Sequence, residues 1–153
     1  MNAVECPDRY YDDFRVGERF VLGSTTIDQE EIIEFATRFD PQIFHTDPVA
    51  AKETVYGGLI ASGWHTGSLM MRLLADHFLG PSSMGSPGLD ELRWLAPVRP
   101  GDELTLQVEV LEMRPSSSKP DRGIVRLTNE LWNQRDEMVV RSVSNMLIMR
   151  RAG

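Results

Sequence analysis

The chain has 153 residues, a formal net charge of −7 at neutral pH, 41% hydrophobic side chains and 25% charged side chains. A chain of this length typically forms one domain with a sizeable core. We therefore predict a single domain over residues 1–153, with a flexible leader at residues 1–10. The negative charge, with no basic run longer than Arg150-Arg151, argues against nucleic acid as a partner. No stretch approaches the roughly 20 apolar residues of a membrane-spanning helix.

The amino terminus and the cysteine content indicate the compartment. Residues 1–8 lack the basic start and apolar stretch of a secretory signal. The single cysteine, Cys6, excludes an intrachain disulfide and suits a reducing environment, so we expect a cytoplasmic protein. The sequence has no Cys/His spacing of a zinc site, no Gly-x-Gly-x-x-Gly fingerprint after a strand and no Gly-x-Ser-x-Gly elbow. We therefore expect neither a metal nor a cofactor.

The first predicted element is a strand from Arg19 to Ser24, and a helix that ends near Phe39 follows it. Residues 26–31 supply N-cap side chains and then acidic residues that complement a helix dipole. The apolar residues of this helix recur with helical spacing and are Ile32, Ile33, Phe35, Ala36 and Phe39.

An acid and a histidine follow this helix as Asp40 and His45. Pro41 disfavours helical backbone at the preceding residue, so we expect Asp40 to leave the helix and lie on a loop. Asp47 and Pro48 then restart a short helix, with Asp47 as its N-cap. Taken separately, Asp40 is better explained as a turn-capping residue and His45 as a buried structural histidine.

A glycine-rich segment from Gly57 to Gly63 leads into the longest apolar helix, which we expect from about Ala61 to Phe78. Backbone N–H groups at a helix start, next to an acid–histidine pair, are the groups needed to move protons beside a developing oxyanion. The order of the two segments therefore favours a functional interpretation of the pair. The residues of this helix assigned to the core include Met70, Met71, Leu73 and Leu74.

The rest of the chain predicts strands. Apolar residues from Leu104 to Val110 alternate with polar ones, as do those from Val125 to Leu131. Residues 134–137 read as a hairpin turn before a returning strand at residues 138–149, and residues 113–123 read as a loop. A long helix followed by antiparallel strands predicts an α+β domain in which a curved sheet wraps the helix.

The two glycine- and acid-containing segments resemble the motifs of the MaoC-like dehydratases, the (R)-specific enoyl-CoA hydratases with a hot-dog fold. The family pattern reads approximately Asp-x-Asn-Pro-x-His-x-Asp and later Gly-x-Ile-Ala-His-Gly. Asp40, His45 and Asp47 have the matching spacing, and Gly58 to Gly63 matches the second motif. Residues 92–102 resemble the strand and turn that come next. The resemblance covers most of the chain and implies an α+β hot-dog fold.

Three positions depart from the family pattern. Pro41-Gln42-Ile43 replaces x-Asn-Pro, Ser62 stands where the family usually has histidine, and Trp94 replaces a common phenylalanine. The acid and the histidine are retained. We therefore expect the departures to affect the acyl group that is accepted more than the type of reaction.

The resemblance implies reversible hydration of a trans-2-enoyl thioester, linked to CoA or to a carrier protein, to the (R)-3-hydroxyacyl thioester. Asp40 and His45 would bind one water, with Asp40 as general base and His45 orienting the water and helping to deliver the proton. The N–H of Gly63 would donate to the enolate oxygen, and the absence of a side chain there would leave room for the thioester. The remaining candidates for substrate binding are Ser62, Gln42 and Ile43.

Two neighbours of this site also have simpler explanations. Ser62 is equally well explained by small-residue packing at the start of the helix. His65, one turn further on, could line the pocket or contact His45, but no family motif gives it a role.

Binding of the thioester requires more than these motifs. A single hot-dog domain leaves a sheet edge exposed and a pocket incomplete, so the resemblance implies a homodimer or a dimer of dimers. If the substrate carries CoA, its phosphates need basic side chains at the rim, and the candidates are Arg93, Arg99, Arg122 and Arg141.

Two other functions stay open. A hot-dog thioesterase shares the fold and the thioester but usually carries its acid on the central helix, where this chain has only Asp76, near the far end. A non-catalytic acyl-binding module would not need both Asp40 and His45. The position of the pair before the helix favours the hydratase.

Overall fold

The computed structural model describes residues 8–152, so Cys6 and most of the predicted leader lie outside the described residues. Five antiparallel strands form one sheet in the order β1-β3-β4-β5-β2. The strands are β1 (Arg19–Thr26), β2 (Gly88–Trp94), β3 (Glu103–Pro115), β4 (Arg122–Trp132) and β5 (Met138–Met149). The helices are the short 3-10 helix η1 (Tyr11–Asp13), α1 (Gln29–Phe39), α2 (Ile43–Thr46), α3 (Pro48–Ala51) and α4 (Gly63–His77).

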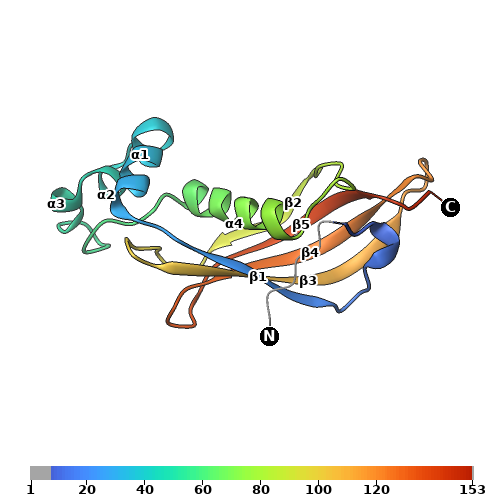
Figure 1. The fold of residues 1–153 in the computed structure, drawn as a ribbon. Coiled ribbons are helices and arrows are strands. Elements are labelled where there is room, and N and C mark those ends of the chain that lie inside the picture. The colour runs from blue at the N-terminus through green and yellow to red at the C-terminus, as the bar shows by residue number, and fades with distance from the viewer. Residues whose placement is uncertain (1–7, 153) are drawn as a thin grey trace.

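Helix α4 lies lengthwise against the sheet, and α1, α2 and α3 gather beyond its amino-terminal end (Figure 1). Met70, Leu73 and Leu74 of α4 are buried in the same core as the inward-facing residues of β3 and β4. Burial of each side chain of this size contributes about 1.5–3 kcal/mol. This packing fixes where the first turn of α4 lies relative to the sheet.

The predicted α+β arrangement, with one long helix against a curved antiparallel sheet, is confirmed. Asp28 caps α1 and Asp47 caps α3 by accepting backbone N–H groups, as the sequence predicts. No helix within residues 8–152 is both long enough and apolar enough to cross a membrane.

Some local predictions are wrong. Met71, assigned to the core, is 45% exposed, because it follows the buried Met70 by one residue and so points about 100° away around the helix. Phe39 is also exposed. The predicted loop at residues 113–123 is shorter, because cross-strand pairing extends β3 to Pro115 and starts β4 at Arg122.

His65 is a buried histidine of α4 that packs between helices. Its ring stacks on Phe35 of α1, with centroids 4.7 Å apart and an interplanar angle of 11°. Its Nδ1 atom is buried and has no hydrogen-bond partner among the described residues. Burial lowers the pKa of His65 below its usual value of 6.5, because the charged ring would lose its hydration. The neutral ring is therefore the form that the fold accommodates.

We predict that His65 makes the fold less stable in acid. As the pH falls below about 6.5, the unfolded chain takes up a proton at His65 before the folded chain does, so the free energy of unfolding decreases. Urea unfolding at pH 7.5 and pH 5.0 measures this difference. His65→Phe and His65→Gln should both lose less stability between these pH values than the unsubstituted protein. Equal losses in all three proteins would contradict the prediction.

Candidate active site

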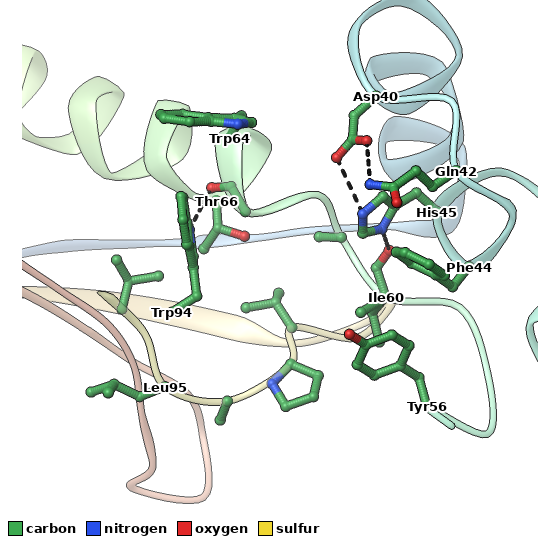
Figure 2. A pocket seen from close by; sticks show the side chains of 16 residues that line it. Asp40, Gln42, Phe44, His45, Tyr56, Ile60, Trp64, Thr66, Trp94 and Leu95 are labelled. Atoms are coloured by element: carbon green, nitrogen blue, oxygen red, sulfur yellow. Dashed lines mark hydrogen bonds and ion pairs between the residues drawn. The ribbon is translucent and has the colours of Figure 1, made fainter. Parts of the chain in front are cut away.

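A cavity of about 520 Å³ opens at the amino-terminal end of α4. Its walls come from the segment between α1 and α3, the first turn of α4 and residues 94–98 (Figure 2). Asp40, Gln42 and His45 supply polar groups to this cavity. The rest of the lining is mainly apolar, with four aromatic rings from Phe44, Tyr56, Trp64 and Trp94.

Asp40 is the C-cap residue of α1, with φ −153° and ψ 68°, outside the helical region. This is the effect expected of Pro41 on the residue before it. The Asp40 carboxylate accepts hydrogen bonds at both oxygens. Gln42 Nε2 donates to Oδ1 at 2.7 Å, and Ser62 Oγ donates to Oδ2 at 2.7 Å. The third neighbour of the carboxylate is His45, whose Nε2 lies 3.2 Å from Oδ2.

His45 is buried in α2, and its surroundings select one tautomer. Its Nδ1 atom lies 2.7 Å from the carbonyl oxygen of Ile60. Since a carbonyl oxygen can only accept, Nδ1 carries a hydrogen, and in the neutral ring Nε2 then has a lone pair. The lone pair therefore faces an Asp40 oxygen that is also an acceptor. Their contact requires a proton shared between them or a molecule that donates to both.

The surroundings of Asp40 favour its charged form. Partial burial raises the pKa of Asp40, but the hydrogen bonds from Ser62 and Gln42, and the His45 ring when it carries a positive charge, together lower the pKa below its usual value. Asp40 is therefore an ionised acceptor at neutral pH, suited to take a proton from a bound molecule.

Gly63 is the first residue of α4, so its N–H is one of those without a partner inside the helix. The indole of Trp94 lies against this glycine, and Trp94 Nε1 donates to the Gly63 carbonyl at 2.9 Å. A Cβ atom on Gly63 would lie 2.5 Å from the Trp94 ring. The close packing of Trp94 is thus a reason for glycine here that the sequence analysis missed, since it considered only room for a thioester.

The structure brings four of the six candidate residues to the cavity lining, namely Asp40, Gln42, His45 and Gly63. Ser62 is fully buried and reaches the site through its bond to Asp40. Ile43 is 52% exposed and does not line the cavity, because it lies two residues before His45 on α2 and so points away from it. His65 packs on Phe35 and does not line the cavity either.

The aromatic side of the cavity was not among the predicted site residues. Trp64 and Trp94 meet edge to face, with ring centroids 5.2 Å apart, and Phe44 contacts both His45 and Tyr56. Trp94 stands where the family commonly has phenylalanine, and this difference is the one sign of the aromatic wall in the sequence. The other three rings have no spacing that marks them, because they come from separate segments.

Three of the four candidate arginines already have acidic partners. Arg93 and Arg141 both pair with Glu91, and Arg122 pairs with Asp121. Arg99 instead donates from Nη2 to the carbonyl of Tyr56 at 2.7 Å, and within residues 8–152 no carboxylate forms a salt bridge with it.

The same part of the chain holds no group of three or more His, Cys, Asp or Glu side chains suited to a metal ion.

Known proteins resemble this chain in both sequence and fold. A family model for the MaoC-like domain matches residues 14–132. A solved MaoC-like dehydratase from Rhodospirillum rubrum is 42% identical, covers 95% of this chain and 99% of its own, and superposes with a TM-score of 0.87. The unliganded R-hydratase PhaJ1 from Pseudomonas aeruginosa is 26% identical, covers 98% and 94%, and has a TM-score of 0.76.

A third similar protein is the 3-hydroxybutyryl-CoA dehydratase of Methylorubrum extorquens. It is 31% identical over 107 residues, which are 69% of this chain and 66% of that protein. The matched family model spans the segment that carries Asp40, His45 and Gly63. The predicted hot-dog fold is confirmed by the similarity to the solved structures, and the chain belongs to the MaoC-like dehydratase family.

Proposed function

We propose that this protein catalyses the reversible hydration of a trans-2-enoyl thioester to an (R)-3-hydroxyacyl thioester. The observation that carries the proposal is the close approach of Asp40 Oδ2 and His45 Nε2, which lie 3.2 Å apart beside the cavity and form a pair of acceptors when the ring is neutral. A water molecule has two hydrogens to donate to such a pair. Family membership and the similarity to an R-hydratase support the same reaction.

The proposed mechanism begins with a water that donates one hydrogen to Asp40 and one to His45. Asp40 takes a proton as the water oxygen bonds to the β-carbon, and the electron pair of the double bond moves toward the thioester oxygen. Asp40, helped by His45, then delivers a proton to the α-carbon. The protein ends unchanged, and one water has been added to the substrate. The N–H of Gly63, at the positive end of α4, would stabilise the negative charge on the thioester oxygen.

The substrate we propose to test first is crotonyl-CoA. The similar 3-hydroxybutyryl-CoA dehydratase acts on a short CoA thioester by its name, and crotonyl-CoA is the dehydrated form of such a substrate. The apolar, aromatic part of the cavity suits an acyl chain. Among the four candidate arginines, Arg99 is the best placed for the CoA phosphates, because no carboxylate of residues 8–152 pairs with it and because it contacts Tyr56 of the cavity wall.

We also propose that the active unit contains a homodimer formed along β2. This strand is an edge of the sheet, and its unpaired backbone groups can join a second copy. Exposed apolar side chains surround this edge, namely Leu89, Trp94 and Leu95, and Trp64 with Met71 on the outer face of α4. Because Trp64 and Trp94 also line the cavity, a partner at this face would help to close it.

Substitution of the pair tests the mechanism. Asp40→Asn removes the base and His45→Ala removes the second acceptor, so each should lower kcat/KM for crotonyl-CoA roughly 10²–10⁴-fold. Loss of the enoyl absorbance measures hydration, and Asp47→Asn is the matched control, because Asp47 caps α3. Near-normal hydration by either active-site variant would exclude the mechanism. Release of free CoA in place of hydration would instead identify a thioesterase.

Substitution of Arg99 tests the phosphate contact. A hydrogen bond to a charged group is worth about 1.5–3 kcal/mol, so Arg99→Gln should raise KM for crotonyl-CoA roughly 10- to 100-fold with little change in kcat. Arg19→Gln, which breaks a pair with Glu109 on the edge of the sheet opposite β2, is the control and should leave KM near its original value. The N-acetylcysteamine thioester lacks the phosphates, so Arg99→Gln should not affect its KM. An equal effect on both substrates would contradict a phosphate contact.

The dimer is tested by the mass in solution. Light scattering after size exclusion should give at least twice the 17.3 kDa of one chain. Leu89→Glu together with Met71→Glu should shift the protein toward the single-chain mass, because each change places a charge on the proposed interface. Val16→Glu alters another exposed apolar residue, one that precedes the opposite edge strand, and should not change the mass. A single-chain mass for the unsubstituted protein would refute the dimer.

A further inference from the structure

We propose that Ser62 and Gln42 are positioning residues that hold the two oxygens of Asp40 separately, so that two neutral donors, and not His45, orient the base. The inference rests on the proposed function for its catalytic consequence, but the geometry that carries it is independent of the substrate. It also changes the role expected for both residues, from contacts with the substrate to contacts with the base.

The two donors bind opposite sides of one carboxylate. Ser62 Oγ reaches Oδ2 and Gln42 Nε2 reaches Oδ1, each at 2.7 Å. The distance from Gln42 is at the short end of the range for an N–H donor, and the distance from Ser62 is ordinary for a hydroxyl donor. With one donor on each oxygen, rotation of the carboxylate about its bond to Cβ would break both contacts.

Both donors are themselves held by the main chain. The Ser62 carbonyl accepts from the N–H groups of His65 and Thr66 at 3.0 and 3.1 Å in the first turn of α4. The Gln42 carbonyl accepts from the His45 N–H at 2.9 Å, and the Gln42 N–H donates to the Asp40 carbonyl at 2.8 Å. The main chain from which each donor projects is therefore held in place before any substrate binds.

His45 cannot replace these donors while its ring is neutral. Its only N–H is on Nδ1 and is committed to the Ile60 carbonyl, so Nε2 offers a lone pair to Asp40 and repels it. Ser62 and Gln42 supply the donors that a partly buried carboxylate needs. Nε2 of His45 then stays available to accept from the reacting water.

Ser62 also links the base to the expected oxyanion donor. It precedes Gly63 directly, so the side chain that orients Asp40 and the N–H that would face the thioester oxygen belong to adjacent residues joined by one peptide unit. Any movement of this peptide shifts the base and the oxyanion donor together. One hydrogen bond and a short covalent path thus connect the base to the expected oxyanion donor.

The pKa of Asp40 can be measured, and it would not change if Ser62 and Gln42 only supported packing. Hydrogen bonds from Ser62 and Gln42 lower the pKa of Asp40 against the effect of burial. Removing either donor should therefore raise this pKa, because the burial remains. A residue that only supported packing would leave the titration of Asp40 where it was.

The experiment compares Ser62→Ala and Gln42→Met with the unsubstituted full-length protein by ¹³C NMR titration of the Asp40 carboxyl. Asp40→Asn assigns the resonance. Each variant should titrate at higher pH, and Ser62→Thr, which keeps a hydroxyl, should titrate nearer the original midpoint. Ser68→Ala is the matched control, because that hydroxyl lies on the same helix and bonds only the Trp64 carbonyl. An unchanged midpoint in both Ser62→Ala and Gln42→Met would overturn the proposal.

Kinetics with crotonyl-CoA then test the catalytic consequence. The acid limb of kcat/KM should move to higher pH in Ser62→Ala and Gln42→Met. At the pH optimum kcat should fall about 10- to 100-fold, since a base displaced by an ångström costs up to about 10², while KM changes little. A fall in affinity without a change in kcat or in the acid limb would identify substrate contacts and overturn the positioning role. Because the NMR titration needs no turnover, it stays decisive even if the protein fails to hydrate any enoyl thioester.

Discussion

The main chain from Ile60 to Gly63 is the constraint on which the site depends. The Ile60 N–H donates to the Phe44 carbonyl at 3.0 Å, and the Ala61 N–H donates to the Val98 carbonyl at 2.8 Å. The Ile60 carbonyl holds the ring of His45. One short segment therefore joins α2, residues 94–98 and the start of α4. It is anchored in turn by the packing of α4 on the sheet, so the stability of the core and the geometry of the site are coupled.

The hydrogen bonds of this segment decide which groups can transfer protons. A neutral histidine whose Nδ1–H is held by a main-chain carbonyl presents a lone pair at Nε2. An aspartate with a donor on each oxygen stays ionised and fixed in direction. Two acceptors next to a cavity form a site for a donor of two hydrogens, and water is the smallest such molecule. The tautomer of the neutral His45 ring and the charged form of Asp40 thus follow from the fold and not only from the identity of the residues.

The aromatic wall links the departures from the family pattern to the shape of the cavity. Trp94 packs so closely on Gly63 that any side chain there would clash, and its indole N–H bonds the Gly63 carbonyl. The first turn of α4 is therefore held from the side of β2 as well as from the core. Since Trp64 and Trp94 remain partly exposed, the shape of this wall also depends on what covers the β2 edge.

Local patterns in the sequence determined much of this structure, because the interactions involved span few residues. The cap at Asp28, the exit of Asp40 before Pro41, the restart at Asp47 and the hairpin at residues 134–137 all follow from short-range backbone preferences. The apolar periods of α4 and of the strands likewise indicated the layer arrangement. Family motifs added the pairing of Asp40 with His45, which spacing alone left open.

Only the tertiary structure decided the partners of these residues. The bond from Ser62 to Asp40 crosses 22 positions, and the contact of Trp94 with Gly63 crosses 31. No local preference encodes such distances, because they result from how α4 and β2 pack on the sheet. The same packing exposed Met71 and Ile43 and buried His65 against Phe35. The sequence by itself thus identified the acid and the histidine, and the fold determined the tautomer, the orientation and the surroundings in which they act.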